Sequence, residues 1–226
     1  MITAAALGVL FARLSSSRME PPAPAPVARL EVRRPAGQLL VISPTDDDIA
    51  LSPDATRVAY LAQDGPARKI WLYSLERGTA LPVEGSEGAR NPFFSPDGRW
   101  VAFVKINGGA LVRSSVEGGP PVPIRPTGFG GSRGASWSDA GFIVIAGASS
   151  LQRVDVASGA VSMIANPERS AGETRMGWPD VLPGGRSVLV TVEVNASTQV
   201  AILDLESKAK KTLIRNATRA RYLPPG

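Results

Sequence analysis

Four arginines precede a turn motif that recurs along the chain, and together they could bind an anion. Arg90, Arg133, Arg175 and Arg219 lie five, five, seven and four residues before successive copies of this turn. A guanidinium group binds carboxylates and phosphates through parallel N–H donors. If the fold brings these positions together, they form a basic rim for an anionic ligand or an acidic partner; otherwise they are four unrelated surface arginines.

Composition restricts the other chemistry that this chain can perform. The 226 residues include no cysteine and no histidine. Disulfides, thiolate metal sites, imidazole ligands and a Ser-His-Asp triad are therefore excluded. We predict no catalytic residue, no metal site and no cofactor.

Two polar segments have some likeness to ligand-binding loops. Asp46, Asp47 and Asp48 are consecutive and lack the alternating oxygen spacing of a calcium loop, so we predict a polar turn that enters a strand. Residues 128–134 (GFGGSRG) lack both the Gly-x-Gly-x-x-Gly spacing and the Gly-Lys-Ser/Thr end of phosphate loops. Asp54 and Asp97 lie inside the recurring turn, where we predict that they accept hydrogen bonds from local backbone amides and have a structural role.

The recurring turn indicates the fold. Its five copies (SPDA, SPDG, SDAG, LPGG and LPPG) begin at Ser52, Ser95, Ser138, Leu182 and Leu223, which are 43, 43, 44 and 41 residues apart. A period in the low forties that is filled with strands is typical of β-propeller blades. The third copy lacks the proline and the fourth lacks the aspartate.

Apolar runs around each turn supply the strands of a blade. The run that follows the turn, at 57–62, 100–105, 142–147 and 187–192, is rich in β-branched and aromatic residues. Two more strands are predicted in each repeat, at 69–75, 110–116, 151–157 and 199–205, and at 79–84, 121–124, 160–165 and 211–215. A blade cannot bury both of its faces alone, so the repeats must stack.

We therefore predict an all-β fold, a β-propeller fragment of four four-stranded blades. The blades are placed at about 46–86, 87–129, 130–172 and 173–217, with one inner strand of a next blade at 218–226. Short strands are also predicted at 28–32 and 38–42. Four blades leave an open flank, so we expect the isolated chain to associate or aggregate.

The first 27 residues have the features of a segment next to a membrane. The apolar run MITAAALGVLFA would span about 18 Å as a helix, against a hydrocarbon core of about 30 Å. We predict that residues 1–14 are a short apolar helix, the remnant of a membrane helix; a weak signal sequence and an irregular terminus are the alternatives. Residues 15–27 contain four prolines and are predicted to be a stiff Pro-rich linker.

These segments resemble TolB-like, WD-repeat-like β-propellers, and more narrowly the extracytoplasmic propeller of bacterial membrane-bound serine/threonine kinases. The resemblance rests on ALSPDATRVAY, RKIWLYSL, NPFFSPDGRWVAF, VEGGPPVPI and ARYLPPG, and it covers about residues 28–226. It implies that the apolar run and the Pro-rich linker correspond to that family's membrane helix and linker. The chain contains no glycine-rich loop, HRD or DFG motif, so it is not a kinase by itself.

We expect a non-enzymatic sensor or protein-interaction module outside a bacterial membrane, tethered through its N-terminus in a parent kinase. The alternatives are the propeller of a prolyl-oligopeptidase-like peptidase and a periplasmic TolB-like scaffold. The expected partner is a protein or an anionic ligand at the channel mouth. Net charge is +5, but the basic residues are scattered, so no nucleic-acid partner is expected.

Overall fold

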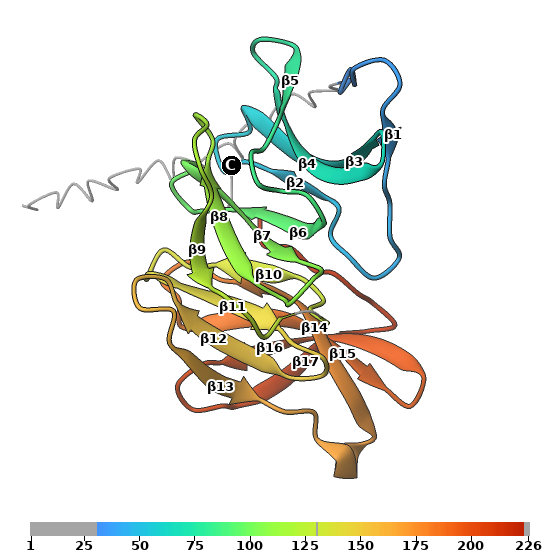
Figure 1. Ribbon diagram of the computed structural model, residues 1–226. Helices are drawn as coiled ribbons and strands as arrows, with labels where there is room; N and C mark the ends of the chain where they lie inside the picture. Colours follow the sequence, from blue (N-terminus) through green and yellow to red (C-terminus); the bar gives the residue numbers. More distant parts are fainter. Residues whose placement is uncertain (1–30, 130, 224–226) are drawn as a thin grey trace, which may run out of the picture. The chain divides into compact units, whose positions relative to one another are not determined.

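The four repeats form four separate antiparallel sheets. The computed structural model describes residues 31–129 and 131–223, and within them each repeat folds as one sheet (Figure 1). The prediction of an all-β propeller fragment with four blades is confirmed. The predicted membrane-helix remnant (1–14) and Pro-rich linker (15–27) lie outside the described residues. In the described part of the chain, no helix has the length and apolar character that crossing a bilayer requires.

In the second, third and fourth blades the strands follow one another in sequence order, whereas in the first blade β1 and β2 both pair with β3. The first blade contains β1 (Leu39–Leu40), β2 (Ile49–Leu51), β3 (Arg57–Asp64), β4 (Ala67–Ser74) and β5 (Thr79–Pro82). The second contains β6 (Ala89–Phe94), β7 (Trp100–Lys105), β8 (Leu111–Ser115) and β9 (Val122–Arg125). The third contains β10 (Ala135–Trp137), β11 (Phe142–Ala146), β12 (Leu151–Asp155) and β13 (Val161–Ala165). The fourth contains β14 (Glu173–Val181), β15 (Ser187–Val194), β16 (Ser197–Asp204) and β17 (Lys210–Arg215), preceded by the short 3-10 helix η1 (Arg169–Ala171).

The repeated turn closes the first hairpin of a blade through a serine and an aspartate. In the first blade, Arg57 N donates to Ser52 Oγ at 2.9 Å, and the Ser52 hydroxyl donates to Asp54. The backbone N–H two residues after Asp54 donates to its carboxylate at 3.1 Å. The same pattern recurs at Ser95 and Asp97. The prediction of a structural role for Asp54 and Asp97 is therefore confirmed.

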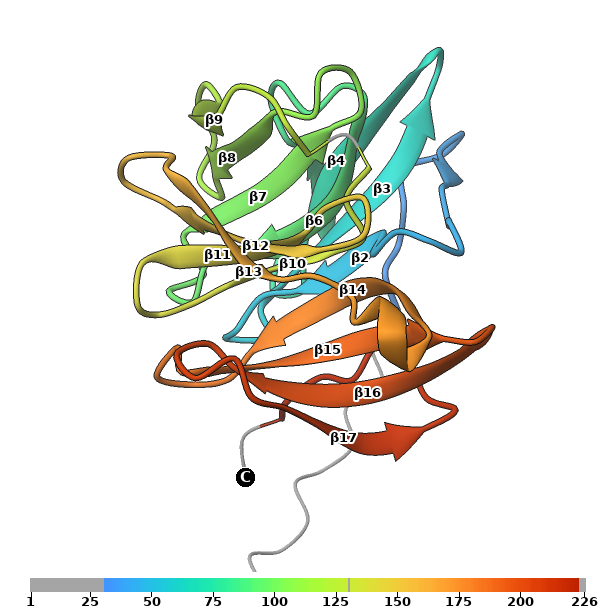
Figure 2. The ribbon, with the colours of Figure 1, turned by 90° about the horizontal axis from the view of Figure 1, so that it is seen from below.

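Successive sheets stack through apolar side chains. The strand β2 contacts β6, β6 contacts β10 and β10 contacts β14, so the first strands of the blades are neighbours (Figure 2). Leu61 and Phe103 belong to the cluster between the first two blades, and Val144 and Val190 to the cluster between the last two. The strands β7 and β11 are buried along nearly their whole length and are thus covered on both faces, which explains their nearly continuous apolar sequences.

Residues 31–42 cover the free face of the first blade. Tyr60, Trp71 and Tyr73 are buried there, and Val32 packs against them. The Tyr60 hydroxyl donates to Gln38 Oε1 at 3.1 Å. Of the two strands predicted in this region, the second contributes β1, which pairs with the end of β3. Residues 31 and 32 of the first are not in a strand, and residues 28–30 lie outside the described chain.

The predicted inner strand of a next blade does not form within residues 218–223. A strand requires a neighbouring strand for its ladder of hydrogen bonds. Here, side chains of the fourth blade bind the backbone instead, because Arg219 N donates to Thr191 Oγ1 at 2.8 Å and Tyr222 N donates to Asp180 Oδ2 at 2.7 Å.

Candidate functional site

Three of the four predicted arginines line one cavity. Arg90 lies in β6 of the second blade, Arg133 in the loop before β10 of the third, and Arg175 in β14 of the fourth. The cavity has a volume of about 310 Å³, and its other lining residues are Thr45, Asp46, Gly131, Ser132 and Ala148. The arginines meet because each lies in or just before the first strand of its blade and these strands are neighbours.

Arg219 lies beside this cavity rather than in it. It lines an adjoining pocket of about 210 Å³ together with Ile42, Ser43, Asp46, Asp47, Asp48 and Ile49. The guanidinium of Arg219 donates to Pro44 O and lies 4.7 Å from the centre of the Trp178 ring. The guanidinium of Arg133 lies 5.6 Å from the same ring. The four positions therefore form two adjoining sites, which share Asp46 as a lining residue.

Carboxylates lie between the arginines. Asp46 Oδ1 is 3.6 Å from Arg90 Nη1, and Asp46 Oδ2 is 3.6 Å from Arg68 Nη2. Glu193 on β15 bridges two other members, because its carboxylate lies 2.9 Å from Arg133 Nη1 and 3.9 Å from Arg175 Nη1.

The sequence interpretation did not include these acidic partners. The sequence places Asp46 only in a predicted polar turn, and Glu193 lies in no motif. Repulsion among the arginines is offset by the protein's own carboxylates, which also hold the guanidinium groups in place.

The three consecutive aspartates have three different environments. Asp46 faces Arg90, Asp47 pairs with Arg221 at 2.9 Å, and Asp48 accepts a hydrogen bond from Ser43 N. Burial raises the pKa of Asp47 above its usual 3.8, although Arg221 opposes this shift. Burial likewise raises the pKa of Asp48. The polar turn predicted here is thus a group of two buried acids and one partly buried acid, and it connects the first blade to other parts of the chain.

A left-handed backbone residue recurs four positions before each later copy of the turn. These residues are Asn91 (φ 52°), Gly134 (φ 83°), Trp178 (φ 48°) and Arg219 (φ 55°). Left-handed φ is unfavourable for bulky side chains and tends to persist at functional sites. Asn91 Oδ1 accepts a hydrogen bond from Asp47 N at 2.8 Å, and Trp178 N donates to Arg133 O at 2.7 Å. Hydrogen bonds at two of these positions therefore connect neighbouring blades.

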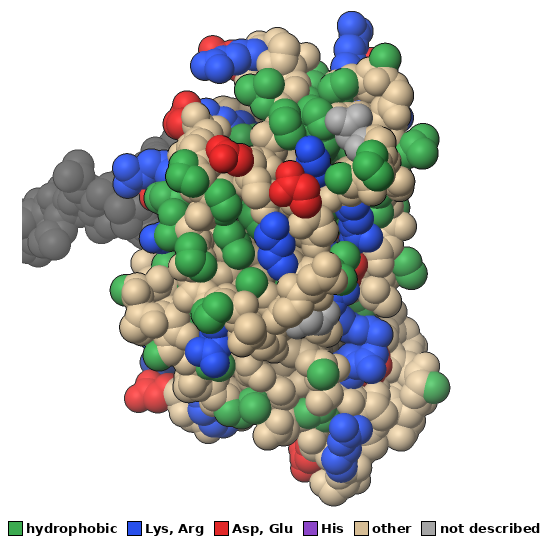
Figure 3. All heavy atoms as spheres, viewed as in Figure 1, with side chains coloured by type: hydrophobic (Ala, Val, Ile, Leu, Met, Phe, Trp, Pro, Cys, Tyr) green, Lys and Arg blue, Asp and Glu red, His purple; other side chains and the backbone are tan. Residues whose placement is uncertain are grey.

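Basic side chains are not gathered into one patch on the face drawn in Figure 3. Lysine and arginine side chains are spread over this face among apolar and acidic ones. The arginine cavity is distinguished by the convergence of arginines from three blades rather than by a broad basic surface.

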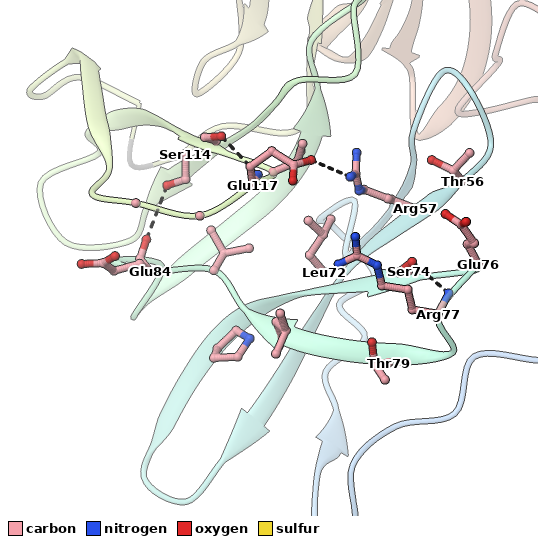
Figure 4. Close-up of a pocket in the computed structure, with 17 residues that line it drawn as sticks. Thr56, Arg57, Leu72, Ser74, Glu76, Arg77, Thr79, Glu84, Ser114 and Glu117 are labelled. Carbon is pink, nitrogen blue, oxygen red and sulfur yellow. Dashed lines mark hydrogen bonds and ion pairs between the residues drawn. The ribbon is translucent and has the colours of Figure 1, made fainter.

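A second cavity lies between the first two blades and has mixed chemistry. Its volume is about 290 Å³, and its lining includes Arg57, Arg77, Leu72, Glu84 and Glu117 (Figure 4). Arg57 Nη2 and Glu117 Oε1 form an ion pair across it at 2.7 Å. Because cations, anions and apolar groups alternate here, this cavity selects a ligand class less clearly than the arginine cavity does.

No protein family model matches the sequence. A curated relative is the uncharacterized peptidase YuxL of Bacillus subtilis (strain 168), which is 32% identical over 111 residues. The match covers 45% of this chain and only 16% of that protein, so it concerns part of the relative.

Comparison with solved structures identifies the fold of this chain. The TolB structure from Acinetobacter baumannii matches 76% of this chain and 45% of that chain, with a TM-score of 0.62 and 20% identity. The putative TolB from Agrobacterium tumefaciens matches 76% of this chain and 68% of that chain, with a TM-score of 0.63 and 17% identity. The chain has a TolB-like β-propeller fold. At these identities the likeness concerns the fold and not the ligand.

Proposed function

We propose that this TolB-like propeller is a non-catalytic recognition module that binds an anionic group of a partner protein in the arginine cavity. The observation that carries the proposal is the convergence of Arg90, Arg133 and Arg175, from three successive blades, on one cavity of about 310 Å³. Ligand pockets have volumes from about 300 Å³ upward, so the cavity suits a side chain or a chain end. The side chains that line it include three that are positively charged and one, Asp46, that is negatively charged.

Binding of an acidic peptide to the full chain tests this proposal. The variant Arg133→Gln/Arg175→Gln should weaken binding and reduce its salt dependence, because two charges that face the ligand are lost. The control Arg99→Gln/Arg186→Gln removes two charges from side chains that are 80% and 75% exposed and that lie outside the cavity. If both double variants lost the same affinity for the acidic peptide, binding would depend on net charge alone. That result would contradict the proposal.

We further propose that the propeller lies outside the cytoplasm, tethered through its N-terminus as part of a membrane-bound serine/threonine kinase. This finer assignment rests on the resemblance carried by segments such as NPFFSPDGRWVAF. Sequencing of the adjoining reading frame tests it, because HRD and DFG motifs upstream are expected. Their absence from the whole gene would remove the kinase assignment and leave the recognition module.

A peptidase-associated propeller is the second candidate, and the match to YuxL favours it. In that case the adjoining reading frame would encode a Gly-x-Ser-x-Gly nucleophile elbow. In either parent protein we propose that the propeller itself is not catalytic, since it contains no histidine or cysteine. Purified chain should show no peptidase, esterase or kinase turnover; turnover that persists through purification and tracks the protein would contradict this.

A further inference from the structure

Asp46 places a buried carboxylate in the wall of the arginine cavity. Its side chain is 6% exposed, and it lines both the arginine cavity and the adjoining pocket. Arg90 and Arg68 each approach it to 3.6 Å, which compensates its charge. That distance is longer than an N–H···O hydrogen bond.

The Oδ1 atom of Asp46 has no hydrogen-bond donor among the described residues. A buried carboxylate oxygen without a donor is uncommon, because the hydration lost on burial is normally replaced by hydrogen bonds. Asp46 lines the cavity, so its carboxylate forms part of the wall that a ligand meets. A ligand that fills the cavity should therefore offer an N–H or O–H group to Asp46.

The other cavity-lining arginines offer the complementary chemistry. Glu193 holds Arg133 and Arg175 side by side, as its carboxylate contacts both. Arg175 Nε is buried and has no acceptor among the described residues. These two guanidinium groups can bind a carboxylate of a ligand, while Asp46 can accept a hydrogen bond from an N–H or O–H group of the same ligand.

We propose that the cavity binds an amino-acid-like head group, with its carboxylate at Arg133 and Arg175 and its ammonium group at Asp46. This inference rests on the proposed function and refines its ligand. For a protein partner, such a head group is an N-terminal acidic residue, which carries a side-chain carboxylate and a free α-ammonium group. A free acidic amino acid carries the same two groups.

Two peptides that differ only in the ammonium group test the inference. The probes are Glu-Ala-Ala-Ala amide with a free N-terminus and the same peptide acetylated, titrated calorimetrically into the full chain. A site that recognises charge alone should prefer the acetylated peptide, which is more negative by one unit. The inference predicts the reverse, with the free peptide bound about tenfold more tightly, as expected for one hydrogen bond between charged groups.

Asp46→Asn should abolish this preference, and Asp48→Asn is the matched control. Asp48 is also a buried acid, but it lines only the adjoining pocket, so its replacement should leave the preference intact. Circular dichroism reports whether each variant folds. The comparison of the two peptides on the unaltered protein remains decisive even if Asp46→Asn does not fold.

The outcomes separate this inference from the proposed function. Tighter or equal binding of the acetylated peptide would overturn the amino-acid-like head group and leave anion recognition standing. Absence of binding by both peptides and by free glutamate would overturn both. Free glutamate that binds more tightly than the free peptide would support the head group and identify an amino acid as its source.

Discussion

Asp47 and Arg221 lie 174 positions apart in the sequence, and their side chains meet at 2.9 Å. Asp47 precedes β2 of the first blade, whereas Arg221 follows β17 of the fourth. Arg221 also contacts Asp180 of β14 at 3.2 Å. One guanidinium thus joins the first and fourth blades by pairing with two carboxylates that are each 16% exposed.

Arg221→Gln should destabilise the chain, because it removes the guanidinium group that pairs with both Asp47 and Asp180. We expect a loss of about 1–2 kcal/mol in the free energy of unfolding, less than for a fully buried pair because Arg221 is 47% exposed. Urea denaturation measures this loss. Asp47→Asn in the same background should restore part of it, and a further loss instead would contradict the ion-pair explanation.

Stability should fall in acid because of the turn aspartates. Hydrogen bonds from the Ser52 and Ser95 hydroxyls are the largest cause that lowers the pKa of Asp54 and of Asp97 from 3.8 to about 2. A lowered folded-state pKa contributes stability that is present above the unfolded value and lost as the pH falls through the folded value. Asp47 and Asp48 act in the opposite sense, because their raised pKa favours the protonated folded chain.

The acid effect can be measured from urea midpoints at about pH 5 and about pH 2.5. We expect a lower midpoint at the acidic value. The difference between the two midpoints should shrink in Asp97→Asn and grow in Asp47→Asn, because the two groups have pKa shifts of opposite sign. Identical differences in both variants and in the unaltered protein would show that neither group governs the acid response.

The arginines should act together in binding. Exposed charge contacts contribute roughly 0.2–1 kcal/mol each, so replacement of Arg90, Arg133, Arg175 and Arg219 by alanine should weaken binding of an acidic peptide far more than any single change. Arg219→Ala should have a smaller effect than Arg175→Ala, because Arg219 lines the adjoining pocket. Fluorescence anisotropy measures the affinities, and unchanged circular dichroism shows that the fold persists. Equal effects of these two single variants would contradict the division into two sites.

Gly134→Ala should destabilise the inner ends of the blades. An added Cβ would lie 3.1 Å from Asp47 Oδ2 and 3.2 Å from Trp178 Cα, at a φ of +83°. Gly141 has a similar φ of +80° and no atom within 4 Å of an added Cβ, so Gly141→Ala is the matched control. We expect each variant to lose about 1 kcal/mol or more from backbone strain, with a larger loss in Gly134→Ala. Thermal unfolding that ranks the two variants in the opposite order would contradict the close approach.

Association of the chain should depend on the segment that covers the first blade. Val32 packs against the cluster that contains Tyr60, Trp71 and Tyr73. Val32→Asp would place a charge against this cluster, so the segment should lift and expose aromatic surface. Light scattering should then show a higher molecular mass than for Val32→Ala. If both variants have the mass of the unaltered chain, the segment does not limit association.

The sequence by itself determined the blade pattern, because its signals are local. Ser52, Asp54 and their equivalents at Ser95 and Asp97 form turns through hydrogen bonds to residues a few positions away. The apolar runs that follow these turns form β3, β7, β11 and β15, since β-branched and aromatic side chains favour strands that are covered on both faces. The inner strand predicted at 218–226 did not form in its described part, because pairing depends on a neighbour that sequence pattern does not supply.

The candidate site was decided only by the tertiary structure. The spacing of Arg90, Arg133 and Arg175 indicated a shared rim, but not that Arg219 would lie in an adjoining pocket. Asp46 and Glu193 became part of the site because stacking of the blades brings residues from distant repeats within a few ångströms of the arginines. Ion pairs of this kind depend on distance in space and not along the chain, so a period of about 43 residues predicts the fold and leaves the charge pattern of the cavity to the packing.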